Sequence, residues 1–359
     1  MGNHNKLLIF TIICIFLRGT NQNSIDAWTL LPHILVVQTD GSSGQLLLSC
    51  LTSTPEEEHV GGSPEDVDIF WKNNGVMETQ RGNLYVVDLE ESLGGGNYTC
   101  HSQTGSLLNY TVVLIKEDND TRKKILLKND QGQYLSCSAN NFNGDFRCSW
   151  SWHAILVGKV AFITAQRAAD GSLPACSVDA SGRHWSCSSG QRKVTCSVDD
   201  GDGGMWCKDE QHCPYAEESQ PIHIDVHVSS KHFLMQTYSS RFFLSDIVKP
   251  DKVIIRKVNA TMVAWSYPSS WNTPFSYFPL TFQIRQLRKS CRTCDHPCTQ
   301  TRVTKTLTVS SPEIYQHQVK RRIMVVCVRA KDALCISQWG EWSFLRLRSG
   351  KRSRKTTKA

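Results

Sequence analysis

The cysteines of this chain constrain its fold more than any other feature of the sequence. Fifteen occur in 359 residues, and one of them, Cys14, lies in an apolar stretch from Leu7 to Leu17. That stretch follows Lys6 and has the length of a signal-peptide core, so residues 1–24 are predicted to be a signal peptide, with an uncleaved anchor as the alternative. Disulfides persist in oxidising compartments, and we therefore expect the remaining cysteines to form them in a secreted, extracellular chain.

Two further features agree with secretion. No later stretch reaches the roughly 20 consecutive apolar residues that a membrane helix needs, so no membrane span is expected. Four sequons predict N-linked glycosylation, at Asn97, Asn109, Asn119 and Asn259. A nuclear or nucleic-acid-binding role conflicts with the signal peptide, and no nucleic-acid partner is expected.

Residues 25–116 have the pattern of an immunoglobulin-like β-sandwich. Short alternating or apolar runs are separated by turn residues, which is typical of strands in a sandwich. Cys50, Trp71 and Cys100 follow one another in the order found in immunoglobulin domains, and Tyr98 precedes the second cysteine by two residues. We expect Cys50 and Cys100 to cross-link the two sheets. Chance spacing in another β fold is the alternative.

A second β domain is predicted over residues 117–246, after the polar segment KEDNDTRKK at its start. Cys137 and Cys148 lie eleven residues apart around a turn-rich segment, which suits a disulfide between neighbouring antiparallel strands. The competing use of these cysteines is a zinc site, but the CxxC spacing of such sites is absent here.

Five more cysteines lie between residues 165 and 213. Nine residues separate Cys187 from Cys196 across the segment SSGQ, so we expect a second hairpin bridge there and a Cys176–Cys207 bridge around it. This nesting is one choice among fifteen connectivities for six cysteines, and it leaves Cys213 unpaired.

A third β domain, over residues 247–345, opens with Pro250 and has the outline of a fibronectin type III module. The predicted fold is therefore all-β, with three sandwiches in tandem, one immunoglobulin-like and two fibronectin type III-like. The hydrophobic content of 40% is that of folded protein. Residues 346–359 hold seven basic side chains and no acidic one, and we expect a disordered tail that either binds heparin-like glycosaminoglycans or only aids solubility.

Near the end of the third domain, Trp339-Gly-Glu-Trp342-Ser343 resembles the Trp-Ser-x-Trp-Ser box of the haematopoietic cytokine-receptor family. In that family the box organises the domain through a ladder of aromatic and cationic side chains. Arg329 is the nearest candidate for the cation, because it alternates with the core residues of its strand. Gly340 replaces the first serine of the box, which puts some of the local hydrogen bonding in doubt.

The order of the three domains, with the segments CPYAEES (213–219), YSSRFFLSDIVKPD (238–251), AWSYPSSWNTPFSYFPLTF (264–282) and VRAKD (328–332), resembles the interleukin-12 beta-subunit family. The resemblance implies a receptor-like chain that binds a four-helix-bundle alpha subunit and presents it to a cell-surface cytokine receptor. It assigns the interchain disulfide to Cys213. It also implies a pocket for an arginine of the alpha subunit, formed by Glu217, Tyr277, Phe278 and Asp332. A homodimer through the same cysteine is a further possibility.

The chemistry of these residues agrees with such a pocket, since carboxylates bind guanidinium groups by charge-assisted hydrogen bonds and aromatic rings flank them. The runner-up is a soluble receptor or decoy that binds a cytokine reversibly and forms no interchain disulfide. An enzyme is not expected, because the sequence has no GxSxG, HExxH or phosphate-loop motif, and no cofactor is implied.

The third domain carries an odd set of cysteines, Cys291, Cys294, Cys298, Cys327 and Cys335. With Cys213 committed to another chain, one of these five is expected to be free or bonded to another chain. The spacing CxxCxxxC, beside His296, resembles a metal-ligand cluster, but in a secreted chain disulfides are the preferred interpretation over zinc.

Overall fold

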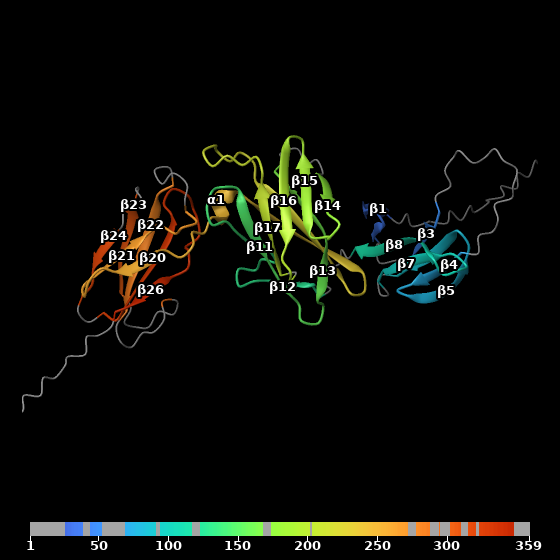
Figure 1. The fold of residues 1–359 in the computed structure, drawn as a ribbon, viewed down its shortest axis with the longest axis horizontal. Helices are drawn as coiled ribbons and strands as arrows, with labels where there is room; N and C mark the ends of the chain where they lie inside the picture. Colours follow the sequence, from blue (N-terminus) through green and yellow to red (C-terminus); the bar gives the residue numbers. More distant parts are fainter. Residues whose placement is uncertain are drawn as a thin grey trace, which may run out of the picture. The chain divides into compact units, whose positions relative to one another are not determined.

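The computed structural model describes most of the chain, and its regular secondary structure is almost entirely β-strand (Figure 1). The described residues are 26–38, 44–51, 69–90, 94–116, 123–167, 174–201, 203–271, 278–287, 294, 302–309 (backbone only), 315–320 and 323–347. The predicted signal peptide lies outside them, and so does the predicted basic tail except for its first two residues: Arg346 ends strand β26 and Leu347 is also described, so the tail begins later than expected. The all-β fold class is confirmed, with one helix of four residues among the described elements. The chain divides into two compact units, Met1–Glu117 and Asp118–Ala359.

The N-terminal unit is one β-sandwich. Its strands are β1 (Asp26–Leu31), β2 (Ile34–Gln38), β3 (Gly44–Ser49), β4 (Phe70–Asn73), β5 (Val76–Arg81), β6 (Leu84–Leu89), β7 (Gly96–His101) and β8 (Leu107–Lys116). One sheet has the order β1-β2-β8-β7-β4-β5, in which β2 runs parallel to β8, and the other pairs β3 with β6. Asn74 and Gly75 both have positive φ angles between β4 and β5, as an Asn-Gly hairpin turn requires.

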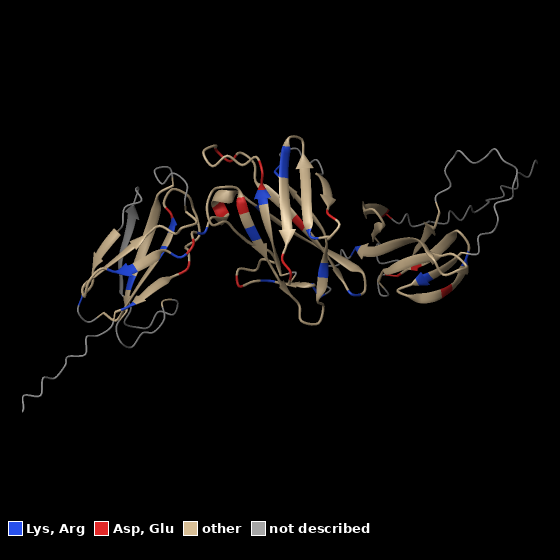
Figure 2. Cartoon of the chain, in the orientation of Figure 1, with Lys and Arg blue, Asp and Glu red and all other residues tan. Residues whose placement is uncertain are grey.

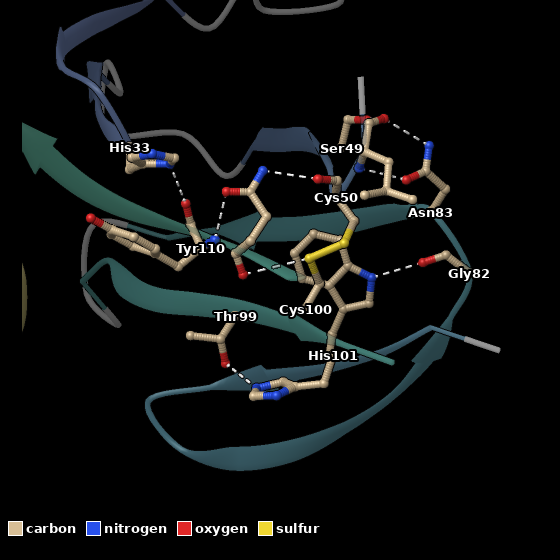
Figure 3. Close-up of a disulfide and its surroundings, with 12 residues drawn as sticks. His33, Ser49, Cys50, Gly82, Asn83, Thr99, Cys100, His101 and Tyr110 are labelled. Carbon is tan, nitrogen blue, oxygen red and sulfur yellow. Dashed lines mark hydrogen bonds between the residues drawn. A yellow bond between two sulfur atoms is a disulfide. The ribbon is translucent and has the colours of Figure 1, made fainter. Parts of the chain in front are cut away.

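The core of this sandwich surrounds the Cys50–Cys100 disulfide (Figure 3). Trp71 is buried, and its Nε1 donates to the carbonyl oxygen of Gly82 at 2.9 Å. Asn109 Nδ2 donates to the Cys50 carbonyl at 2.8 Å and so ties β8 to the end of β3. The disulfide therefore lies in a fully packed and hydrogen-bonded environment, with Tyr98 also buried nearby on β7.

The C-terminal unit holds two further sandwiches. Its elements are β9 (Leu126–Leu127), β10 (Ser136–Ser138), β11 (Asp145–Ser149), β12 (Ser151–Trp152), β13 (Gly158–Gln166), β14 (Ala175–Val178), β15 (His184–Ser189), β16 (Arg192–Val198), β17 (Gly204–Asp209), β18 (Ile222–Ser230), β19 (Leu234–Phe242), α1 (Leu244–Ile247), β20 (Ile254–Lys257), β21 (Met262–Ser266), β22 (Leu280–Leu287), β23 (Arg302–Val309), β24 (Tyr315–Gln318), β25 (Val325–Asp332) and β26 (Ser343–Arg346). In the central sandwich, β13, β18 and β19 face a sheet of order β10-β11-β17-β16-β15-β14.

Three disulfides cross-link neighbouring strands of that six-stranded sheet. They are Cys137–Cys148, Cys176–Cys187 and Cys196–Cys207, and in each the two cysteines are eleven positions apart in the sequence. In each pair the two cysteines are direct cross-strand neighbours, with their Cα atoms 4.0 Å apart. Every bridge therefore fixes the register of one strand pair.

The predicted nesting of Cys176 with Cys207 and of Cys187 with Cys196 is wrong. Register is the physical reason: β15 and β16 are neighbours, but Cys187 lies opposite Val194 and not opposite Cys196. A disulfide needs its two Cβ atoms to face each other at close range, and that offset prevents it.

The third sandwich packs a sheet of order β20-β21-β24 against one of order β23-β22-β25-β26. Cys294 and Cys327 form a disulfide, so Cys294 is not available as a zinc ligand. Cys291, His296 and Cys298 lie outside the described residues. Within the part of the chain that the structure covers, no three His, Cys, Asp or Glu side chains are grouped as metal ligands.

The aromatic box stabilises this sandwich through stacked cations. Arg329 lies 4.5 Å from the ring centroid of Trp342 and 4.8 Å from that of Trp339. The Arg285 guanidinium also lies over Trp342, 4.5 Å from its ring centroid. Ser343 Oγ donates to the Val253 carbonyl at 2.6 Å. Each cation–π contact contributes about 0.5–2 kcal/mol, so the ladder ties β22 and β25 to the final segment.

Gly340 keeps the hydrogen bonding of the box intact. Its backbone N–H donates to the Ala330 carbonyl at 2.7 Å, and a Cβ at this position would collide with the carbonyl oxygen of Pro250. The glycine in place of serine therefore permits a close backbone approach. The replacement of the first serine by glycine therefore does not disrupt the hydrogen bonding of the box.

Charged residues are interspersed along the described parts of both units and do not gather on one element (Figure 2). The seven basic residues after Phe344 that dominate the positive net charge of the sequence begin at Arg346, and most of them lie outside the described residues. The described residues contain no helix long and apolar enough to cross a membrane.

Candidate partner-binding pocket

The C-terminal unit contains a cavity of about 370 Å³ where loops of its two sandwiches meet. We call it the acidic pocket; the residues that carry the argument are Phe142, Glu217, Glu218, Phe278, Asp332 and Cys335. Three of the five partner-binding residues expected from the sequence, Glu217, Phe278 and Asp332, thus line one cavity although they come from distant parts of the chain.

The other two expected residues have different positions. Cys213 is exposed and lines a neighbouring cavity of about 90 Å³, which shares Glu217 and Glu218 with the acidic pocket. Tyr277 lies outside the described residues. The structure therefore brings four of the five expected residues to one region of the surface.

Glu218 holds the segment Cys213–Ser219 in place. Its carboxylate accepts from Arg167 Nη1 at 2.9 Å and from the backbone N–H groups of Leu244 and Ser245 at 3.0 Å each. Arg167 also pairs with the buried Asp209 at 2.8 Å. Burial by itself would raise the pKa of Glu218, but the two backbone hydrogen bonds and Arg167 outweigh it and lower that pKa.

Aromatic rings form one side of the acidic pocket. Phe142 stacks on Phe278 with the ring centroids 4.6 Å apart, and Trp271 meets the edge of Phe142 at 5.9 Å. Trp271 Nε1 donates to the Phe278 carbonyl at 3.0 Å and so holds the backbone at this ring. Asn141 Nδ2 donates to the Ser270 carbonyl at 2.9 Å, so both sandwiches contribute to this side of the pocket.

Asp332 is the residue of the pocket whose chemistry best suits a cationic ligand. It ends β25 and is only 1% exposed, and its Oδ1 accepts from the N–H groups of Leu334 and Cys335 at 2.7 Å each. Its Oδ2 is buried and has no hydrogen-bond partner among the described residues. Burial raises the pKa of this carboxyl. An unpaired buried carboxylate oxygen is costly, and a cationic donor would remove that cost.

The surroundings of the pocket suit a partner that is both apolar and basic. Three carboxylates line the pocket, and its lining includes neither lysine nor arginine. Large apolar side chains are exposed beside it, with Tyr215 56%, Leu334 72% and Ile336 95% exposed. A desolvated anchor surrounded by apolar contacts is typical of the energetic centre of a protein interface.

Two cysteines of this region form no disulfide within the described chain, Cys213 and Cys335. The expectation of a free cysteine in the third domain thus falls on Cys335, which lines the acidic pocket. Burial first, and then the Asp332 charge and a hydrogen bond to that carboxylate, raise the pKa of the Cys335 thiol to about 11.

Sequence reasoning missed Glu218, Phe142 and Cys335 as pocket residues. Glu218 is adjacent to the expected Glu217, yet only Glu218 reaches the buried Arg167, while Glu217 is exposed. No local pattern distinguishes the two neighbouring glutamates. The signal for Cys335 was present, because it lies three residues after Asp332 in the sequence.

The described sequons differ in exposure. Asn259 is exposed between β20 and β21, where its Oδ1 accepts from the Thr261 N–H at 2.9 Å. Asn97 and Asn109 are half-buried, and Asn109 Nδ2, the atom that carries a glycan, is hydrogen-bonded to Cys50. Asn119 lies outside the described residues. Glycosylation stays a prediction, and the geometry favours Asn259.

Comparison with known proteins identifies relatives along nearly the whole chain. Residues 132–230 match the protein family described as "Cytokine interleukin-12p40 C-terminus". Interleukin-12 subunit beta of Homo sapiens is 27% identical over 357 residues, covering 95% of this chain and 98% of the human one. The proteins of the same name from Sigmodon hispidus and Equus caballus are 28% and 29% identical, each over 88% of this chain and 91% and 92% of their own. These relatives are cytokine chains and not enzymes.

Proposed function

We propose that this chain, which is similar to the interleukin-12 beta subunits along most of its length, is the secreted beta subunit of a heterodimeric cytokine. It binds a four-helix-bundle alpha subunit through the acidic pocket and a disulfide at Cys213, and it presents the pair to a cell-surface receptor. The observation that carries this proposal is the Asp332 carboxylate, buried with Oδ2 unpaired beside exposed apolar side chains.

The pocket chemistry supports an arginine of the alpha subunit as the anchor. A guanidinium group donates several hydrogen bonds in one plane and suits a carboxylate better than an ammonium group does. Phe278, and Tyr277 by resemblance, supply the aromatic surface against which a guanidinium packs. The exposed thiol of Cys213 lies on the same segment as Glu217 and Glu218, so a partner seated in the pocket has a cysteine within its contact area.

Electrophoresis of secreted complexes tests the proposal. The chain is co-expressed with candidate helical subunits, as wild type and as Cys213→Ser, and the medium is run with and without reductant. We expect a larger species that requires Cys213 and collapses to two chains on reduction. Ser219→Ala serves as the matched control in the same segment. A chain that stays monomeric with every partner, or that binds only reversibly, would instead support the soluble receptor or decoy.

Three further interactions belong to this proposal. The first domain is the natural place for the receptor contact, because the second and third carry the partner pocket. A homodimer through Cys213 is expected when the alpha subunit is absent. The basic residues 346–359 are proposed to bind heparin-like glycosaminoglycans, and their removal should lower the salt concentration at which the chain elutes from a heparin column.

A further inference from the structure

Cys335 is a free thiol inside the acidic pocket, next to the Asp332 carboxylate, whose Oδ2 has no hydrogen-bond partner among the described residues. Two independent observations coincide here: the thiol lines the cavity without a disulfide in the described chain, and Asp332, 1% exposed, has an unpaired Oδ2 in the same cavity. The proposed arginine contact uses the carboxylate alone. The thiol beside it has no role in that contact.

We propose that Asp332 and Cys335 form a covalent binding site for cationic disulfides, in which the positive group pairs with Asp332 and the adjacent sulfur exchanges with Cys335. The ligand class is a short ammonium or guanidinium group two or three atoms from a disulfide bond. Glu217 adds to the attraction at the mouth of the pocket, whereas the Glu218 carboxylate is already ion-paired with Arg167. This site goes beyond the proposed function, because it requires no helical subunit.

The cation does two things in this site. In the free pocket the thiol stays protonated, because burial and the negative charges of Asp332, Glu218 and Asp246 raise its pKa to about 11. A bound ammonium group offsets the Asp332 charge and lowers that pKa, so it increases the thiolate fraction at the moment when the disulfide is positioned. Binding and activation therefore depend on the same charge.

The exchange step balances without any further reagent. The Cys335 thiolate attacks one sulfur of the disulfide, the bond between the two ligand sulfurs breaks, and a new bond forms from Cys335 to the attacked sulfur. The second half of the ligand leaves as a thiolate and takes up the proton that Cys335 released. Cys335 is oxidised and the leaving half is reduced, so the ligand disulfide is itself the oxidant.

A pair of reagents that differ only in charge tests the proposal. Cystamine ends in ammonium groups, and bis(2-hydroxyethyl) disulfide is its neutral isostere. The full chain carrying Cys213→Ser is treated with each, and modification of Cys335 is followed by peptide mass spectrometry. Each rate is divided by the rate of the same reagent with a different neutral thiol, N-acetylcysteine amide, which corrects for the intrinsic reactivity of the disulfide. We expect a preference for cystamine of about tenfold at low ionic strength, falling in 0.5 M salt.

Variants separate charge from accessibility. Asp332→Asn keeps the Oδ1 acceptor for Leu334 and Cys335 but removes the charge, and it should bring the preference to within about twofold of unity. Glu217→Gln should lower the preference for cystamine by less than Asp332→Asn does. Because Glu217 is exposed, this variant should fold normally and still tests the role of charge. The exposed Cys213, measured in a Cys335→Ser chain, should show a smaller preference than Cys335.

Three results would overturn the proposal: an unchanged preference in Asp332→Asn, no reaction of Cys335 in the native chain although it reacts in urea, or a disulfide between Cys335 and another cysteine. None of these measurements involves the alpha subunit. Failure of heterodimer formation would therefore leave the proposal standing, and failure of charge-selective exchange would leave the heterodimer standing.

Discussion

Two of the three carboxylates that line the acidic pocket, Glu218 and Asp332, differ in how they are paired. Glu218 accepts hydrogen bonds from Arg167 and from two backbone N–H groups, and its pKa is lowered. Asp332 is more deeply buried, leaves Oδ2 unpaired, and its pKa is raised. The satisfied acid holds the fold together, and the unsatisfied acid is available to a ligand. Two acids in one cavity can therefore have different roles, and the hydrogen-bond and ion-pair partners of each carboxylate distinguish the structural acid from the ligand-binding one.

Removing the satisfied acid should have the largest effect. In Glu218→Ala, Arg167 loses one of its two carboxylate partners and keeps only Asp209. The backbone N–H groups of Leu244 and Ser245, at the start of α1, lose their hydrogen-bond acceptor. Breaking a buried ion pair costs about 3–5 kcal/mol of unfolding free energy. Because Arg167 keeps Asp209, we expect a loss of about 3 kcal/mol. A urea titration of the whole chain, read by hydrogen exchange of the peptide that covers α1, measures it.

The neighbouring Glu217→Ala provides the control for that experiment. Glu217 is exposed, so its removal should change the unfolding free energy by no more than about 0.5 kcal/mol. Equal losses in the two variants would contradict the division into a structural and a ligand-binding acid.

Removing the unsatisfied acid should affect binding instead. Asp332→Asn should weaken the complex with the alpha subunit by about 10–100-fold, because a hydrogen bond to a charged group contributes about 1.5–3 kcal/mol. The same variant should not destabilise the free chain, since it removes a buried charge that has no cationic partner. Titration calorimetry with the alpha subunit, both chains carrying serine in place of the interchain cysteine, measures the affinity. A destabilised free chain with unchanged affinity would reverse the assignment.

The two acids should also respond to pH with opposite signs. The folded-state pKa of Glu218 lies below its unfolded value, so its contribution to stability is present above the unfolded pKa and is lost as the pH falls through the folded pKa. The folded-state pKa of Asp332 lies above its unfolded value, so its contribution is full below the unfolded pKa and is lost as the pH rises through the folded one.

A pH series of unfolding free energies tests these signs. The stability difference between Asp332→Asn and wild type should grow in favour of the variant as the pH rises from about 4 to 7. The difference between wild type and Glu218→Gln should shrink as the pH falls below about 4. The opposite trend in either series would contradict the assignment of a lowered pKa to Glu218 or of a raised pKa to Asp332.

The sequence predicted the architecture well because the features that encode it are local. Alternating strands, the order of Cys50, Trp71 and Cys100, and the Trp339 box all lie within short segments, and their structural consequences follow from strand period and side-chain type. The candidate cation Arg329 was found in this way, since alternation along one strand places it opposite the core residues. Such inferences need no knowledge of distant contacts.

The disulfide map and the pocket depended on register and on contacts between distant segments. The pairing expected in the central sandwich is wrong because the short turn between Cys187 and Cys196 does not bring them into register, whereas a separation of eleven positions recurs in all three bridges. That repeated spacing was visible in the sequence. The difference between Glu217 and Glu218 was not, because it depends on Arg167, which is 51 residues away from Glu218.

The smallest effect in this comparison concerns Glu217, the third acid of the pocket. It is exposed, so solvent screens its attraction for a basic partner, and exposed ion pairs contribute about 0.2–1 kcal/mol. Glu217→Gln should therefore weaken alpha-subunit binding by no more than about fivefold, and the effect should disappear at high salt. In Asp332→Asn the loss should persist in salt, because a desolvated charge is screened far less. If Glu217→Gln weakened binding as much as Asp332→Asn, burial would not be what distinguishes the ligand-binding acid, and the aromatic surroundings of Phe278 would have to explain the anchor instead.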